Sequence, residues 1–408
     1  MYKPLILFCV SKPNVYSFAK LLSIIEHNPG IFSNYDVVTL RASLFQLDTA
    51  TSQRYKIPER PFVIIPVSLM TTQKSEFVTF MRTIVPQLRL TNPNILFVVG
   101  GWHASGDPKG TLKMGADYVI PGEAEISFPQ FLFDLAENRK TVPQLYSISD
   151  PVELNIYPPY SEKYRVFCPI EISRGCPFRC KFCQTGQQYT TMKHASHDSI
   201  VKWVDRAVKI RYDRVWFTSP NSFAYGSPKG GGTNPLAVKK LLKSIKNIDN
   251  LEEIYFGTFP SEVRPEFVTK EMMGAVHPYI SNKFFTIGAQ SASNGLLKKI
   301  WRGHTFEQVL DATDVILDYG YGVDLDFIFG LPGETSADLH KTLDYFNEIL
   351  RSSKKIRIHT HTFMPLPNTP YSNEPVGVIQ PEVETLLGKL ASHNKAYGSH
   401  EKQSQLKK

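Results

Sequence analysis

The chain has 408 residues, which is too long for one ordinary hydrophobic core, and 42% of them are hydrophobic, which excludes wholesale disorder. No apolar run reaches membrane-spanning length, and the N-terminal stretch lacks a charged region followed by a small-residue cleavage site. We therefore predict a cytoplasmic protein without membrane contact. The net charge of +8 is diffuse, and no nucleic-acid-binding motif accompanies it, so nucleic-acid binding is not supported.

Residues 1–138 alternate short apolar runs with amphipathic stretches. Strands are predicted at Leu5–Val10, Val37–Leu40, Phe62–Leu69 and Ile95–Val99, and at a short strand and turn within Gly115–Gly122. Helices are predicted at Lys74–Leu88, which has apolar residues at helical spacing, and from about Ile126 to Glu137. This alternation predicts an α/β fold with an open, doubly wound sheet of the flavodoxin or Rossmann kind.

Residues 139–164 are rich in Pro, Ser and Asp and are predicted to be a linker. A second βα series follows over residues 165–365, with helices between its strands. Its strands are predicted at Phe167–Ser173, Arg214–Ser219, Glu253–Thr258, Phe284–Gln290, Val323–Phe329 and Arg357–Phe363. Six βα units predict a partial barrel, in which functional residues lie at the C-terminal ends of strands. Residues 366–408 are predicted to be a C-terminal extension.

Three of the five cysteines form a C-x₃-C-x₂-C cluster directly after a predicted strand: Cys176, Cys180 and Cys183. An odd number of cysteines argues against a disulfide framework. Thiolates bind iron–sulfur clusters or zinc, and zinc ribbons usually show paired C-x₂-C knuckles, of which no second pair occurs here. The spacing therefore favours a cubane cluster whose fourth iron is open. Cys9 and Cys168 lie in apolar strands and are expected to be buried thiols.

This cysteine spacing, with Phe182 before the last cysteine, resembles the radical S-adenosylmethionine (SAM) superfamily. Later strand ends resemble the branch that includes the oxygen-independent coproporphyrinogen oxidases. The resemblance implies a [4Fe–4S] cluster on the three cysteines and SAM contacts from Phe182 and four polar residues: Glu262, Gln290, Arg302 and Asp326. Such side chains suit the ribose hydroxyls, the ammonium and the carboxylate of SAM.

Each polar residue also has an ordinary interpretation. Arg302 could cap a surface helix, and Glu262 could pair locally with Arg264. Their order on successive strand ends favours the SAM site. Asp324 and Asp326 alternate with apolar residues, so they share a face, which we expect to be the barrel lumen. The usual Gly-Gly motif after the second strand is absent, and Ser219 or Asn221 substitutes for it as a predicted SAM contact.

Small and polar residues at strand ends of the N-terminal domain resemble the cobalamin-binding domain found ahead of the radical SAM core in a large subfamily. The resemblance implies cobalamin contacts from the segments around three predicted strand ends: Ser68, Leu69 and Thr71; Gly100, Gly101 and His103; Gly122 and Glu123. The Asp-x-His-x-x-Gly motif that supplies a histidine to cobalt is absent. We therefore expect five-coordinate or water-ligated cobalt, with His103 near the nucleotide tail or in the turn. Without cobalamin, these residues are ordinary strand-to-helix turns.

The preferred reading is a cobalamin-dependent radical SAM C-methyltransferase with an external electron donor such as ferredoxin or flavodoxin and an unidentified substrate. A second reading keeps the radical SAM core but gives another outcome, such as cyclisation, rearrangement or dehydrogenation. A third reading is a non-enzymatic iron–sulfur or RNA-binding module, supported only by the basic charge. The sequence assigns no catalytic residue beyond the cofactor sites.

Overall fold

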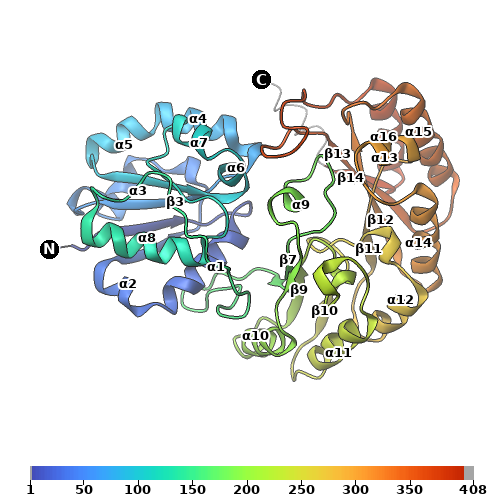
Figure 1. Ribbon diagram of the computed structural model, residues 1–408, viewed down its shortest axis with the longest axis horizontal. Coiled ribbons are helices and arrows are strands. Elements are labelled where there is room, and N and C mark those ends of the chain that lie inside the picture. Colours follow the sequence, from blue (N-terminus) through green and yellow to red (C-terminus); the bar gives the residue numbers. More distant parts are fainter. Residues whose placement is uncertain (1, 399–408) are drawn as a thin grey trace. The chain divides into compact units, whose positions relative to one another are not determined.

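The computed structural model describes residues 2–398 and divides the chain between Cys168 and Pro169 into two compact units (Figure 1). Each unit has its own parallel sheets and helices, and each is described by itself. No helix of the described residues is both long enough and apolar enough to cross a bilayer.

The first unit contains a parallel sheet whose described strands lie in the order β2-β1-β3-β4-β5, as in flavodoxin-like folds. The strands are β1 (Leu5–Cys9), β2 (Asp36–Leu40), β3 (Val63–Ser68), β4 (Ile95–Gly100) and β5 (Tyr118–Val119). The helices are α1 (Val15–Glu26), α2 (Pro29–Asn34), α3 (Thr49–Arg54), α4 (Lys74–Thr83), α5 (Val85–Thr91), α6 (Gly101–Gly106), α7 (Pro108–Lys113) and α8 (Ala124–Asn138). The predicted doubly wound α/β fold is confirmed.

Helices cover both faces of this sheet (Figure 1). Because side chains alternate along a strand, β1 serves two cores: Leu5 and Leu7 pack with residues of α4 and α5, whereas Ile6 and Phe8 pack with residues of α1 and α8. Burial on both faces explains why the strands read as continuous apolar runs in the sequence.

Two details differ from the sequence prediction. The helix predicted over Lys74–Leu88 is divided into α4 and α5 near Ile84, because Pro86 lies in the first turn of α5 and provides no backbone N–H for a continuing helix. The segment 139–164, predicted as a linker, packs on the first unit. Val119 donates to the backbone carbonyl of Gln144, and Tyr146 joins the core. The exact domain boundaries stay a prediction.

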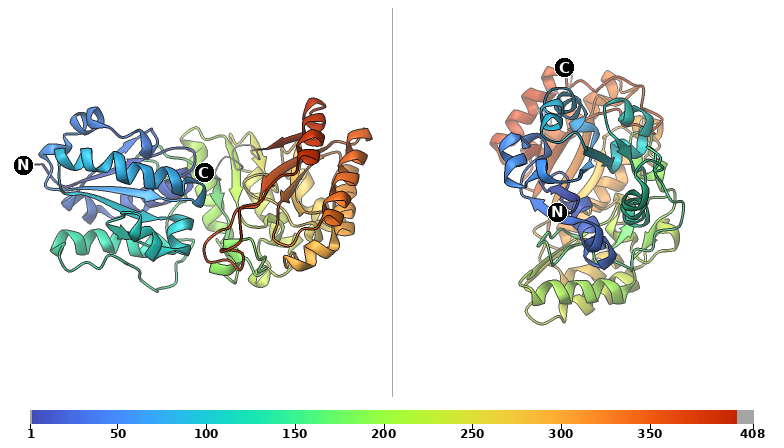
Figure 2. Two further views of the ribbon diagram at one scale, coloured as in Figure 1. Left: turned by 90° about the horizontal axis from the view of Figure 1, so that it is seen from above. Right: turned by 90° about the vertical axis from the view of Figure 1, so that its left-hand side faces the viewer.

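The second unit contains a series of parallel strands with helices on their outer side (Figures 1 and 2). The strands are β6 (Ile170–Glu171), β7 (Ser173–Arg174), β8 (Lys193–His194), β9 (Arg214–Thr218), β10 (Glu253–Tyr255), β11 (Phe284–Gln290), β12 (Gly322–Phe329), β13 (Ile356–Thr362) and β14 (Ala396–Gly398). The helices are α9 (Gln184–Gln188), α10 (His197–Lys209), α11 (Pro235–Lys246), α12 (Lys270–Val276), α13 (Asn294–Lys299), α14 (Phe306–Asp318), α15 (Ser336–Arg351) and α16 (Pro381–Ser392).

Among the described residues of this unit, parallel sheets run in the orders β10-β9-β6 and β11-β12-β13-β14, and β7 pairs with β8 in an antiparallel hairpin. A parallel bridge between Val263 and Ile287 lies next to β11. The predicted partial βα barrel is therefore present. The region predicted as an extension contributes α16 and β14, and β14 adds a parallel strand beside β13.

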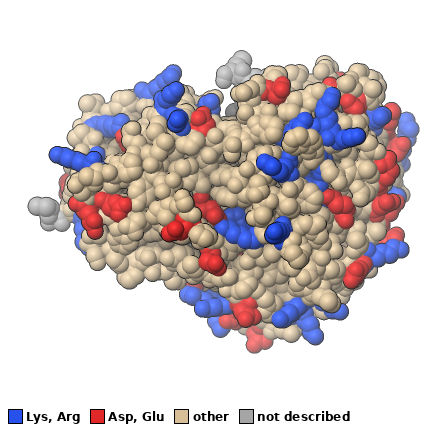
Figure 3. Space-filling view, in the orientation of Figure 1, with Lys and Arg blue, Asp and Glu red and all other residues tan. Residues whose placement is uncertain are grey.

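Charged side chains of both signs are interspersed on the face of the molecule that Figure 3 shows. This pattern agrees with the diffuse character of the net charge of +8.

Candidate functional site

The three clustered cysteines lie on one loop between β7 and α9. Cys183 is the residue immediately before α9, and the Cys176 backbone N–H donates to the carbonyl of Tyr189 at 2.9 Å. Gly175 precedes the loop with φ +90°, and a Cβ there would lie 2.1 Å from the Thr191 carbonyl oxygen. Only glycine fits this turn, so the sequence Gly-Cys has a structural cause.

Two guanidinium groups lie against this loop. Nη1 of Arg302 is 3.8 Å from the Cys180 sulfur, and Nη1 of Arg264 is 4.0 Å from it. Burial raises the pKa of the Cys176 thiol to about 11 and also raises the pKa of Cys183. Buried thiolates at neutral pH need a cation, which iron supplies directly and the arginines support. The donor set fits an iron–sulfur cluster.

Four predicted SAM contacts come from strand ends and the loops after them, and interactions join three of them. The Glu262 and Asp326 carboxyl groups share a hydrogen bond, and the positive charge of Arg302 favours the ionised form of Glu262. Burial and the Asp326 carboxylate raise the pKa of Glu262 to about 8, so the pair holds a proton at neutral pH. Arg302 donates to the Gly288 carbonyl at 2.7 Å, near the end of β11.

Gln290, the fourth of these residues, ends β11 in a left-handed backbone conformation with φ +70°. The β11–β12 register shifts between Gly288 and Gln290, so the strand carries a bulge there. The Gln290 side chain is buried, and its Oε1 atom has no hydrogen-bond partner among the described residues. Strained backbone and an orphaned buried acceptor are typical of ligand-binding positions.

The structure settles the ordinary interpretations of two residues. Arg302 is half-buried against Cys180 and does not cap a surface helix. The ion pair of Arg264 goes to Glu266 at 2.6 Å rather than to Glu262.

The weaker SAM candidates after β9 are also buried. Asn221 Oδ1 accepts from the Arg264 backbone N–H at 3.4 Å, and its Nδ2 atom is buried without a hydrogen-bond partner among the described residues. Ser219 Oγ accepts from the Asn221 backbone N–H at 3.2 Å. Phe182 is partly buried against an apolar cluster that includes Ile300 and Phe363, which anchors the end of the cysteine loop.

The cobalamin candidates gather at the C-terminal ends of β3, β4 and β5, which are neighbours in the sheet. Gly101 has φ +90°, and a Cβ there would lie 2.8 Å from the Leu69 backbone nitrogen. The buried His103 ring joins Thr71 Oγ1 through Nδ1 at 3.1 Å, while its Nε2 atom has no partner among the described residues. Burial lowers the pKa of His103, so the ring is neutral.

Other members of this set lie at the same edge of the sheet. Ser68 Oγ donates to Ser17 Oγ at 2.9 Å, and the Gly122 backbone N–H donates to Ser105 Oγ at 2.8 Å. Gly100 accepts from the Leu69 backbone N–H, and Glu123 immediately precedes α8. A crowded backbone with small residues and an orphaned ring nitrogen fits a large ligand at this edge.

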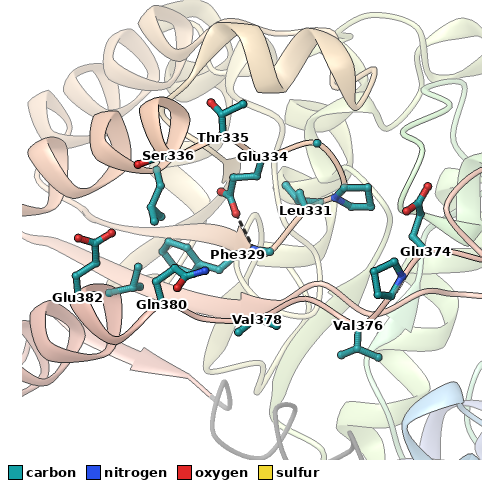
Figure 4. Close-up of a pocket in the computed structure, with 16 residues that line it drawn as sticks. Phe329, Leu331, Glu334, Thr335, Ser336, Glu374, Val376, Val378, Gln380 and Glu382 are labelled. Carbon is teal, nitrogen blue, oxygen red and sulfur yellow. Dashed lines mark hydrogen bonds between the residues drawn. The ribbon is translucent and has the colours of Figure 1, made fainter.

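A separate hollow of about 550 Å³ lies beside the loop after β12 (Figure 4). The loop Gly330–Ser336 lines one part of it, and the segment Glu374–Val383 lines another. The Glu334 carboxylate accepts from the Gly330 backbone N–H at 2.7 Å, and burial raises the pKa of Glu334 to about 7. Of the described residues, none of the predicted SAM contacts lines this hollow.

Two histidines of β13, His359 and His361, lie next to Asp326. Sequence reasoning predicted their strand but gave them no role. The available signal was the alternation His-Thr-His, which places both rings on one face of a strand.

Comparison with known families agrees with the two folds. The family model described as the radical SAM superfamily matches residues 170–346, and the model described as a B12 binding domain matches residues 36–132. The chain therefore contains a B12-binding domain followed by a radical SAM domain. The cofactors of these two domains are a [4Fe–4S] cluster, SAM and cobalamin, as predicted.

Solved structures share this architecture. The methyltransferase TsrM from Kitasatospora setae, solved with cobalamin and a [4Fe–4S] cluster, has a TM-score of 0.65 and 16% identity, covering 92% of this chain and 78% of its own. The cobalamin-dependent radical enzyme OxsB has a TM-score of 0.64 and 16% identity, covering 85% and 52%. At this identity the likeness shows the fold.

The curated relatives include a tRNA-2-methylthio-N(6)-dimethylallyladenosine synthase of Buchnera aphidicola, which is 25% identical over 295 residues, covering 70% of this chain and 63% of the relative. The chain spans only 42% to 64% of the length of the first such relatives.

Proposed function

We propose that the protein is a cobalamin-dependent radical SAM C-methyltransferase. The observation that carries the proposal is that one chain contains two sites, each with residues that suit its cofactor. One is a cysteine loop beside Arg302 and the orphaned Gln290, and the other is the crowded strand edge at Gly101 and His103. Each belongs to a domain whose family model matches.

In the proposed radical SAM site, Cys176, Cys180 and Cys183 hold the cluster. Gln290 and Arg302 contact SAM, with further contacts proposed from Glu262, Ser219, Asn221 and Phe182. The guanidinium suits the SAM carboxylate, and the amide suits ribose hydroxyls. When bound, the reduced cluster and SAM supply a 5′-deoxyadenosyl radical, and cobalamin supplies the methyl group.

In the proposed cobalamin site, Ser68, Leu69, Thr71, Gly100, Gly101, His103, Gly122 and Glu123 surround the corrinoid or its nucleotide tail. His103 is buried in the turn and bonded to Thr71, which favours a role beside the tail over one on cobalt. The electron donor in the proposal is external and of the ferredoxin or flavodoxin type.

Methylthio transfer, the activity named for several relatives, is the main competing outcome. It adds sulfur as well as a methyl group and so needs a sulfur source. Beyond the cluster loop the chain has only Cys9 and Cys168, and both are buried in the apolar core of the first unit. Burial raises the pKa of Cys9 to about 12, so this thiol is a poor ligand. This observation favours methyl transfer over methylthio transfer.

The test begins with protein purified without oxygen, reconstituted with iron, sulfide and cobalamin, and analysed for iron and cobalt. The reduced protein is then given SAM with a labelled methyl group. Formation of 5′-deoxyadenosine together with S-adenosylhomocysteine and a labelled corrinoid is the expected result. A variant with all three loop cysteines changed to Ala is the control and should lose iron and 5′-deoxyadenosine.

Each other outcome removes part of the proposal. Iron with 5′-deoxyadenosine but no retained cobalt leaves a radical SAM enzyme of another outcome, such as cyclisation or dehydrogenation. Retained cobalt without labelled corrinoid removes the methyl transfer. Absence of a cluster, with zinc in its place, overturns the radical SAM assignment.

A further inference from the structure

A histidine pair and a carboxylate converge on neighbouring strands in the second unit. In the parallel register of β12 and β13, Asp326 lies beside His359, and Ile328 lies beside His361. Because His359 and His361 are two positions apart, their side chains leave β13 on the same face. One ligand atom from each of Asp326, His359 and His361 lies within 4.8 Å of the other two.

The geometry inside this group is tight. The Asp326 Oδ1 atom and the His359 Nδ1 atom are 2.8 Å apart, and the ring centroids of His359 and His361 are 4.4 Å apart. The Asp326 side chain is only 4% exposed and the His359 side chain 20% exposed. The described residues offer no hydrogen bond to the His361 ring, which leaves its nitrogens free for a ligand.

The neighbouring aspartate on β12, Asp324, has a different kind of partner from Asp326. Asp324, one pleat away on β12, forms a two-bond ion pair with Arg357, with Nε at 2.6 Å. Asp324 is therefore neutralised by a guanidinium, whereas Asp326 faces two imidazoles. Imidazole and carboxylate together are the ligand set of divalent transition metals such as zinc, manganese and iron.

We propose that Asp326, His359 and His361 bind a divalent transition-metal ion, with Zn²⁺ as the reference ion, at a site separate from the cysteine loop. Three protein ligands leave at least one coordination position open, as in catalytic rather than structural zinc sites. An oxygen or nitrogen donor of the substrate can take that position. The proposal goes beyond the proposed function and assigns Asp326 to a metal rather than to SAM.

Outer contacts hold the ligands in place. The Tyr397 ring, from β14, stacks on the His359 ring with centroids 4.7 Å apart and planes at 18°. The Glu262 carboxyl group also shares a hydrogen bond with Asp326. Partners of this kind fix the orientation of metal ligands and raise their affinity. The strand from the C-terminal region thereby acquires a specific role, which is to orient His359.

The test measures metal content of the full chain. The protein is reconstituted with its iron–sulfur cluster, dialysed against Zn²⁺, washed with a weak chelator, and analysed for zinc and iron. We expect one zinc ion per chain beside a full complement of iron. His359→Ala and His361→Ala should each lose the zinc and keep the iron. His340→Ala is the matched control, because this histidine lies exposed on α15 and bonds its own helix through the Ser336 carbonyl.

Iron content separates this proposal from the radical SAM assignment, since the cysteine loop binds zinc only when it lacks a cluster. Zinc retained equally in His359→Ala and His361→Ala, or absent from the parent protein, would overturn the proposal. A second measurement distinguishes loss of the metal site from misfolding of a variant. Added Zn²⁺ should raise the melting temperature of the parent and of His340→Ala, but not that of the conservative variant His361→Asn. An equal rise in all three would also overturn it.

Discussion

Replacing Gln290 by glycine should separate stability from SAM binding. The left-handed conformation at φ +70° costs a residue with a Cβ about 1–2 kcal/mol. The buried amide oxygen without a partner costs about 1–3 kcal/mol more. Glycine removes both costs, but it loses two buried methylenes at about 0.8 kcal/mol each and adds about 0.5–1 kcal/mol of backbone entropy. We expect nearly unchanged stability or a gain of up to about 3 kcal/mol.

SAM binding by Gln290→Gly should weaken in spite of this stability. A side-chain amide bonded to SAM is worth about 1–3 kcal/mol, which corresponds to a rise in Kd of about fivefold to 150-fold. The measurement is SAM affinity of the reconstituted protein by calorimetry, beside thermal unfolding of the same sample. Gln290→Ala keeps the strain and loses the amide, so it should bind SAM equally weakly but be less stable than the glycine variant.

A matched control tests the cost of the left-handed backbone conformation alone. Asn250 has φ +64° at an exposed position, so Asn250→Gly should change stability by less than about 1 kcal/mol and leave SAM affinity unaltered. If Gln290→Gly binds SAM as tightly as the parent and unfolds at much lower temperature, the residue is structural and the reasoning from strain is refuted.

Three further changes have outcomes that the structure predicts. Glu334→Gln should match the parent in thermal stability below pH 4.5 and exceed it above pH 7, by up to about 3 kcal/mol. The reason is that the parent protein, in which the folded-state pKa of Glu334 is raised, loses stability as the pH rises through that pKa. The exposed Glu382→Gln should show no such trend. Gly101→Ala should lose cobalt but keep iron on elemental analysis, because its Cβ would press on the Leu69 backbone at 2.8 Å; full cobalt retention would contradict the cobalamin assignment. Asn92→Ala should lower the unfolding free energy by about 2–4 kcal/mol in a denaturant titration, since its buried amide bridges two backbone carbonyls at 2.8 and 2.9 Å; a loss under 1 kcal/mol would contradict this.

Sequence periodicity predicts the long elements well. The strand Phe284–Gln290 has the same bounds in the structure, and the strand predicted over Val323–Phe329 is β12, which begins one residue earlier. Such segments carry several turns or pleats of one consistent pattern. Short elements lack that redundancy. β14 has only three residues, Ala396–Gly398, and its strand character comes from pairing with β13, which no local pattern contains.

In the candidate site, too, some features can be predicted from the sequence and others cannot. The cysteine cluster is visible in the sequence because its ligands are close together along the chain. The conformation of Gln290 is not visible, since a left-handed backbone is expected of glycine or asparagine and here follows from a bulge between two strands.

The two aspartates of β12 show why register decides chemistry. By sequence, Asp324 and Asp326 are equivalent: each alternates with apolar residues, and both point to one face. In the structure the neighbouring strand distinguishes them, because β13 places Arg357 beside Asp324 and His359 beside Asp326. A difference of two positions along the same two strands makes one carboxylate half of an ion pair and the other a candidate metal ligand. A shift of the β13 register by two residues would place Arg357 beside Asp326 in one direction, or His359 beside Asp324 in the other, without altering the hydrophobic pattern that predicts either strand.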